Sequence, residues 1–390
     1  MTEATKGDIA FALSGLGGNN AHGAGFLAAA QDLAGREGNR PAFFPGLKMI
    51  TCTSGTIASV AAYLQRQDLR AMVQSRITAV DRATCLPPQP WADPMRLALI
   101  TGWVGVPGVF GPYVQAVAEH ALAQGAAVAA GTRPPLPPTP QEWVNTVLPA
   151  RMFVPEIPET DFEGWAEALN NTQIGVVFNS FDPTAGQEYL YVNEPGMKLI
   201  KQHHDPGADY DGERKRSTYK PIEAQAIRKA LWLFWYGFDD PRQHVDGAYA
   251  RSIILNEATF ASTIYAVKPV NHRWIGPLPR NALEVLDMQT ELWMGTSYRL
   301  QSYQIDLVNR LLEDDRLRGV TETMGRARVP AGQEGSSPST QSKHLKEYHA
   351  IRIVPVEIQM QRGFFTYFIE DMDVFDAARE QARELLRSGT

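Results

Sequence analysis

Ser54 is the residue of this sequence that is best placed to act as a nucleophile. It lies in the segment Met49–Ser59, where an apolar stretch typical of a strand stops at a turn of small residues and a helix begins. Such a turn lifts one side chain above the edge of a sheet and directs the free N–H groups of the helix towards it. The pattern favours nucleophilic acyl transfer by Ser54, and a simple helix cap is the alternative.

A glycine-rich loop precedes Ser54 and offers the hydrogen-bond donors that acyl transfer needs. It runs from Gly15 to Gly23, directly after the apolar segment Ile9–Leu13. Dinucleotide binding is the first rival, but the third glycine of that fingerprint would fall on Asn20, and the second strand does not end in an acidic residue. No Gly-Lys-Ser/Thr follows, which excludes a Walker loop. The remaining role is to present backbone N–H groups to the oxyanion of a tetrahedral intermediate.

Asp246 is the candidate general base for this serine. Ser54 follows only the second predicted strand, whereas the nucleophile of α/β-hydrolases lies well into the sheet and is followed by an acid and a histidine. Three histidines lie downstream in no recognisable setting, namely His272, His344 and His349. Asp246 lies in the turn His244–Tyr249, where Gly247 permits close approach of the backbone. An isolated Asp-Gly pair is more often a surface turn. Only its occurrence together with the glycine-rich loop and the Ser54 turn favours a direct pairing of serine and carboxylate.

Taken together, these segments resemble the patatin-like lipid acyl hydrolases. That family has three ordered motifs: a glycine-rich oxyanion loop, a Gly-x-Ser-x-Gly elbow and an Asp-Gly-Gly/Ala motif. Here they correspond to Ser14–Gly18 with His22–Leu27, to Thr53–Gly55 and to Asp246–Ala248. The segments 219–230 and 256–267 resemble the sequence around the family's Asp motif.

The resemblance implies a three-layer α/β/α patatin-like fold with a central, mostly parallel sheet. It implies a Ser54–Asp246 dyad that works without a metal or cofactor, with the N–H groups of Gly17 and Gly18 as oxyanion donors. The implied activity is hydrolysis of lipid acyl esters, of the phospholipase A, lysophospholipase or esterase type. An acyltransferase with the same dyad and a non-catalytic lipid-binding protein are the alternatives. The implied partner is a lipid or other acyl ester, with transient contact to a membrane surface.

The sequence departs from the family pattern around both motifs of the nucleophile. Cys52 and Thr56 stand where the elbow usually has glycines, and Leu16 replaces a glycine of the first loop. His22 stands where Arg or Lys is usual, and Asn19-Asn20 resembles an insertion. Because crowding at the elbow demands small side chains, the position of the nucleophile is predicted more firmly than its activity.

The elements that would position these residues alternate between strands and helices. Strands are expected at Ile9–Leu13, Leu47–Thr53, Gln173–Asn179, Glu188–Val192, Thr263–Val267 and Ile351–Ile358, and helices at Ala24–Leu33, Gly55–Gln67, Ile222–Phe238, Asn281–Leu312 and Val374–Leu386. Two successive strand-to-helix units predict right-handed crossovers and a parallel sheet. The glycine loop and Ser54 would then meet at the carboxyl edge of that sheet, where ligands of open α/β folds bind.

One catalytic domain is expected over residues 1–390, interrupted by two regions. Residues 80–165 are predicted to form a cap-like insertion that includes the uncharged segment Leu97–Ala118 and the polyproline connector Thr132–Pro140. Regularly spaced glycines and two prolines argue against a regular helix in the uncharged segment. A buried apolar loop and a cap that lines the acyl chain are its two interpretations. Residues 321–342, rich in Gly, Ser and Pro, are expected to form a mobile loop.

Composition limits the classes to which the chain can belong. An apolar content of 44% and a charged content of 21% are ordinary for a globular protein with a large core. A net charge of −6 argues against general nucleic-acid binding. Cys52 and Cys85 cannot form a disulfide framework, and with a polar N-terminus they favour a cytoplasmic location. The segment 203–211 is expected to be a solvated loop rather than a metal site, because its His and Asp residues fix no ligand spacing. The oligomeric state stays open.

Overall fold

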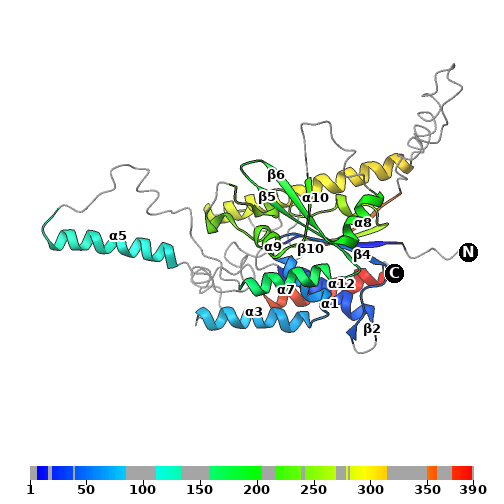
Figure 1. The fold of residues 1–390 in the computed structure, drawn as a ribbon, viewed down its shortest axis with the longest axis horizontal. Coiled ribbons are helices and arrows are strands. Elements are labelled where there is room, and N and C mark those ends of the chain that lie inside the picture. Colours follow the sequence, from blue (N-terminus) through cyan, green and yellow to red (C-terminus); the bar gives the residue numbers. More distant parts are fainter. Residues whose placement is uncertain are drawn as a thin grey trace, which may run out of the picture.

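The computed structural model describes eleven stretches of the chain, from near the N-terminus to residue 388. They are residues 7–15, 20–37, 40–84, 111–132, 158–203, 217–238, 242–268, 278–279, 282–313, 349–357 and 371–388. Within them the chain forms a central sheet with helices on both faces (Figure 1). The expected three-layer α/β/α architecture is confirmed.

The sheet has eight strands among the described residues. In space they follow the order β10-β9-β1-β4-β5-β6-β7, and β8 pairs with β5. Their bounds are β1 Ile9–Leu13, β4 Leu47–Cys52, β5 Gly175–Asp182, β6 Gln187–Val192, β7 Ser217–Pro221, β8 Val245–Asp246, β9 Thr263–Lys268 and β10 Arg352–Glu357. The β5–β6 and β5–β8 pairs are antiparallel and the other pairs are parallel. The carboxyl ends of β1, β4, β9 and β10 therefore share one edge. A separate two-stranded hairpin joins β2 (Arg36–Glu37) to β3 (Arg40–Pro41).

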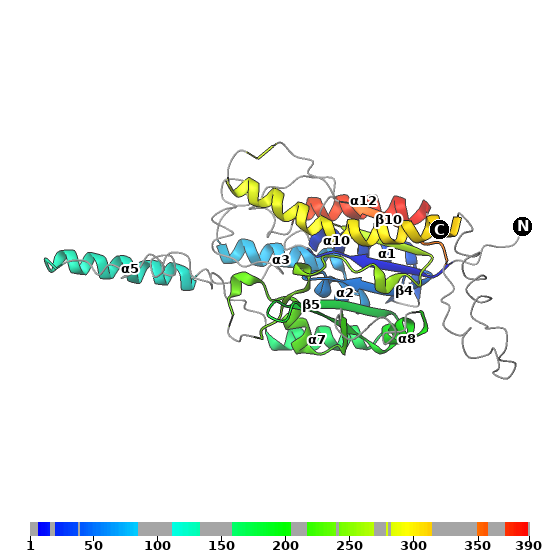
Figure 2. The same cartoon turned by 90° about the horizontal axis from the view of Figure 1, so that it is seen from above.

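Helices bury both faces of this sheet. One face packs against α1 (Asn20–Ala34), α2 (Thr56–Leu64), α3 (Leu69–Thr84), α7 (Glu159–Asn170), α9 (Ala224–Ala230) and α12 (Met372–Ser388). The other face packs against α8 (Glu194–His203), α10 (Ala282–Glu313) and the chain around η4 (Asn256–Ala258). Figure 2 shows these layers from above.

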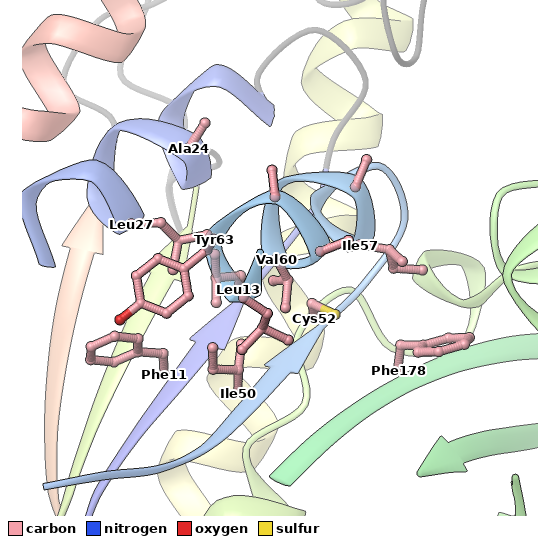
Figure 3. Packing of buried hydrophobic residues seen from close by; sticks show 14 of the residues in the cluster. Phe11, Leu13, Ala24, Leu27, Ile50, Cys52, Ile57, Val60, Tyr63 and Phe178 are labelled. Carbon is pink, nitrogen blue, oxygen red and sulfur yellow. The ribbon is translucent and has the colours of Figure 1, made fainter. Parts of the chain in front are cut away.

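Burial on both faces explains why the central strands are continuous apolar runs. All five residues of β1 are buried, as expected for a parallel strand covered on both sides. Phe11 meets Phe26 of α1 edge to face, with 4.9 Å between the ring centroids. Val60 and Ile57 of α2 lie over Leu13 and the end of β4 (Figure 3). Each fully buried side chain of this size contributes about 1.5–3 kcal/mol, which fixes α2 and its N-terminal turn on the sheet.

The predicted helix Ile222–Phe238 is wrong beyond residue 230. The α9 helix ends at Ala230, and a short 3-10 helix, η2 (Phe234–Tyr236), follows after a turn. The carbonyl oxygen of Trp232 accepts a hydrogen bond from the N–H of Asp246 at 2.7 Å. A continuing helix would direct that carbonyl along its own axis, so the long-range bond to Asp246 requires the break.

The prediction that Leu97–Ala118 lacks a regular helix is wrong from residue 111 onwards. The α5 helix spans Gly111–Ala129 and stands clear of the sheet in both views (Figures 1 and 2). Pro112 lies in its first turn, where the missing N–H of proline costs nothing. Leu122 is 73% exposed, so this helix is not a buried apolar segment.

Residues 133–140 of the expected connector Thr132–Pro140 and the expected loop 321–342 lie outside the described residues. No helix among the described residues is long and apolar enough to cross a membrane.

Candidate active site

Ser54 occupies a strained turn between β4 and α2. Its φ angle is +59°, in the left-handed region that residues other than glycine rarely adopt. Such a conformation costs about 1–3 kcal/mol and persists only where the surrounding structure imposes it. Here Leu13 accepts a hydrogen bond from the N–H of Thr53 at 3.2 Å, and Ser54 itself accepts one from Ile57 at 3.0 Å. The strand-to-helix elbow predicted from the sequence is therefore present in the backbone.

Thr56, the bulkier of the two unusual flanking residues, is accommodated within this turn. Its hydroxyl donates to the Thr53 carbonyl at 2.7 Å and lies 3.3 Å from the Thr53 N–H. A Cβ atom on Gly23 of α1 would lie only 3.2 Å from the Thr56 methyl group. The absence of a side chain at Gly23 therefore leaves space for this methyl group beside the elbow. Cys52 is a buried core residue, and burial raises the pKa of its thiol far above the usual value.

Gly15, at the start of the glycine-rich loop, touches the elbow directly. A Cβ atom at this position would lie 2.0 Å from the Thr53 carbonyl oxygen and 2.7 Å from the Ser54 Cβ. Only glycine fits such an approach. The expected oxyanion donors, Gly17 and Gly18, lie outside the described residues.

Asp246 is brought to Ser54 by the short strand β8. This strand pairs with β5 so that Asp246 lies opposite Ser180. The Asp246 carboxylate accepts a hydrogen bond from the Ala248 N–H at 2.8 Å, and the Ser54 hydroxyl lies close enough to lower the pKa of this carboxyl. It is 2% exposed. The two residues that the sequence analysis selected for proton transfer therefore both lie buried, close to each other.

Burial changes the acid–base chemistry of Asp246. Desolvation raises the pKa of its carboxyl from 3.8 to about 7, although hydrogen bonds from Ser54 and Ala248 lower it in part. A carboxylate with this pKa is a far stronger base than an ordinary aspartate. It can accept a proton near neutral pH without a histidine.

Asn179 and Arg251 hold the Asp246 turn in place, and the sequence analysis missed both. The Asn179 amide donates to the carbonyl oxygens of Gly247 at 3.2 Å and of Arg251 at 3.0 Å. A Cβ on Gly247 would lie 2.1 Å from Asn179 Oδ1, so only glycine can follow Asp246 here. The Arg251 guanidinium is partly buried and lies between Glu188, at 3.1 Å, and Glu257, at 2.9 Å. A polar residue within the apolar strand 175–182 was the signal that could have indicated Asn179.

His22 does not contribute a positive charge to the site. It is buried in the first turn of α1, and burial lowers the pKa of its imidazole to about 4. The ring is therefore neutral at physiological pH, unlike the Arg or Lys usual at this position in the family that the sequence resembles.

No metal-binding cluster of three or more His, Cys, Asp or Glu residues occurs within the described stretches. In the segment 203–211, which the sequence predicts to be a solvated loop rather than a metal site, His203 is the last residue of α8. Residues 204–211 lie outside the described residues.

Comparison with known proteins adds little to this geometry. No protein-family model matches the chain. No curated protein sequence matches it either. Among solved structures, the crystal structure of VipD from Legionella pneumophila is similar with a TM-score of 0.33 and 11% sequence identity, covering 99% of this chain and 68% of that chain. A TM-score this low carries no conclusion about fold or function, so the chemistry has to be inferred from the residues themselves.

Proposed function

We propose that this chain is a patatin-like serine hydrolase that cleaves acyl esters of lipids through a Ser54–Asp246 dyad. The observation that carries the proposal is that a strained Ser54 lies beside the buried Asp246 carboxyl, whose pKa is raised by burial and lowered in part by the Ser54 hydroxyl. Strain and a perturbed pKa are both characteristic of functional sites, because neither stabilises the fold.

The reaction proceeds through an acyl-enzyme. Asp246 accepts the Ser54 proton while the serine oxygen bonds to the ester carbonyl carbon, and the resulting tetrahedral oxyanion is bound by N–H groups of the glycine loop. The carbon–oxygen bond to the alcohol breaks as Asp246 returns its proton to that alcohol. Water then attacks the acyl-enzyme, Asp246 accepts a proton from the water, and the fatty acid leaves as Ser54 is reprotonated.

Aromatic side chains beside Asp246 support a lipid as the substrate. The Tyr249 ring lies 4.1 Å from that of Phe234 and 5.9 Å from that of Trp293 on α10. Phe238, 49% exposed, continues this group towards solvent. Such a wall suits an acyl chain. We further propose transient contact with a membrane surface, a cap formed within residues 80–165, and a cytoplasmic location.

Labelling with a fluorophosphonate tests the proposal, because only an activated serine reacts. Wild-type protein should be labelled at Ser54, and Ser54→Ala and Asp246→Asn should abolish both labelling and ester hydrolysis. Ser59→Ala is the matched control, since Ser59 is a buried serine of α2 whose hydroxyl has no hydrogen-bond partner. Turnover retained in Ser54→Ala would falsify the assignment.

Two further measurements separate the alternatives. Product analysis with and without an alcohol acceptor distinguishes hydrolysis from acyl transfer. An ester series of increasing chain length, with and without micelles, tests the preference for lipids. A protein that binds lipid but is never labelled would be the non-catalytic alternative.

A further inference from the structure

A row of three side chains leads away from the Asp246 turn across one face of the sheet. His244 lies directly before β8 and contacts the hydroxyl of Ser180, the residue paired with Asp246, so His244 and Asp246 lie on the same face of the sheet. The His244 ring lies over Tyr189 of β6, with 4.6 Å between the centroids. The Lys220 ammonium of β7 lies 4.4 Å from the centre of the same Tyr189 ring.

His244 is fixed in this row as a neutral, polar group. Its Nδ1 lies 2.9 Å from the Ser180 hydroxyl, which in turn lies 3.1 Å from the Tyr191 hydroxyl. Burial, together with the positive charges of Lys229 and Lys220, lowers the pKa of the His244 imidazole to about 4, although the Asp182 carboxylate opposes this shift.

Two lysines place positive charge beside His244. Lys220 is exposed and Lys229 is half-buried, and within the described part of the chain neither forms an ion pair. The negative charge of Asp182 raises the pKa of His244 in part. The Asp182 carboxylate also accepts hydrogen bonds from Thr184 and Ala185. Glu223 is exposed, and its negative charge raises the pKa of Tyr191.

We propose that Lys220, Lys229 and His244 form a subsite for the phosphate group of a phospholipid whose acyl ester is attacked at Ser54. Two lysines supply charge and six N–H donors, and the imidazole supplies a directional hydrogen bond. Tyr189 lies about two strand spacings, ~10 Å, from Asp246. The Lys220 ammonium lies over this ring, so a phosphoglycerol ester is long enough to place its phosphate group at Lys220 and its acyl ester at Ser54. This inference rests on the proposed function.

The test compares two monomeric substrates with identical acyl chains, dihexanoyl phosphatidate and dihexanoylglycerol. Wild-type protein should prefer the phosphatidate. In Lys220→Met/Lys229→Met the ratio of the two kcat/KM values should fall about 100-fold, because each charge-assisted contact is worth about tenfold. Lys220→Arg/Lys229→Arg, which keeps both charges, should retain most of the preference.

Lys198→Met/Lys201→Met is the matched control. It makes the same change of charge on exposed lysines of α8, which follows the end of β6 at the edge of the sheet opposite Asp246. Its substrate ratio should equal that of the wild type. An equal ratio in the Lys220/Lys229 variant and the wild type would overturn the subsite while leaving the hydrolase intact.

Binding measurements on Ser54→Ala separate the subsite from catalysis and from free phosphate. Calorimetry should show dihexanoyl phosphatidate binding that weakens about 100-fold when both lysines are replaced by methionine. Inorganic phosphate should compete poorly, and equal affinity for inorganic phosphate would instead make the free anion the ligand. If no ester is cleaved by the wild type, the proposed function fails, but lysine-dependent binding of phosphatidate still supports the subsite. Phosphatidate binding that is unchanged when both lysines are replaced would refute the subsite.

Discussion

Asp246→Asn is expected to abolish ester hydrolysis and yet to stabilise the folded protein above neutral pH. The Asp246 carboxyl is buried at 2% exposure, and desolvation raises its pKa from 3.8 to about 7. A shift of roughly three units corresponds to about 4 kcal/mol in the free energy of unfolding. Ionised Asp246 therefore costs the fold a large part of an ordinary stability of about 5–15 kcal/mol.

The direction of the pH dependence follows from proton binding. The folded-state pKa of Asp246 lies above the unfolded value, so between about pH 4 and about pH 7 the folded protein binds more protons than the unfolded chain. The free energy of unfolding consequently falls as pH rises through this window. Asparagine stays neutral throughout and its carbonyl can still accept the Ala248 N–H. The variant should therefore gain stability over the wild type with rising pH, by up to about 4 kcal/mol at about pH 8.

Urea unfolding of both proteins at about pH 5 and about pH 8 measures this difference. Asp182→Asn is an informative control, because its pKa is lowered: burial raises it, but hydrogen bonds from Thr184 and Ala185 together outweigh burial. Because the folded and unfolded pKa values of Asp182 both lie below about pH 4, its carboxylate is ionised at both test pH values, and the substitution should destabilise the protein equally at about pH 5 and about pH 8, in contrast to Asp246→Asn. A stability difference for Asp246→Asn that does not change with pH would refute the raised pKa.

The same site yields three further expectations. The kcat/KM for a neutral ester should rise with pH to a plateau above about pH 7 and fall to about 1% two units lower, because only ionised Asp246 accepts the proton; a flat profile would exclude it as the base. Gly15→Ala should displace Ser54, lower the free energy of unfolding by more than about 2 kcal/mol and remove most of the activity. Gly164→Ala, in open space on α7, is the control and should not destabilise the protein in urea unfolding. Arg251→Met should lower the free energy of unfolding by about 3–5 kcal/mol, because it removes the guanidinium that pairs the buried Glu257 and the partly buried Glu188; a loss below about 1 kcal/mol would show that these carboxylates are solvated.

Elements set by local patterns could be predicted from the sequence. The apolar runs that became β1, β4 and β9 and the amphipathic segment that became α10 were identified within a few residues. The predicted helix at 222–238 failed because the Trp232 carbonyl is needed by Asp246, a residue far along the chain. Local helical periodicity holds no information about such a long-range hydrogen bond.

The same distinction applies to the site. Ser54 and Asp246 were selected because each stands in a short motif, and the structure places both in buried positions close to each other. Asn179 has no motif, and its role depends on the position of Gly247 in the folded chain. The positive charge near His244 likewise comes from separate elements that only the sheet brings together.

Two costs to stability meet at the proposed dyad, and their coincidence is the physical case for function. Ser54 is held in a left-handed conformation that glycine would adopt without strain. Asp246 is buried where asparagine would avoid the cost of desolvation. Three glycines, Gly15, Gly23 and Gly247, leave the space that lets the surrounding elements enforce this arrangement. A chain selected for stability alone would relieve both costs by single substitutions, and their retention supports the proposed chemistry of a serine next to a basic carboxylate.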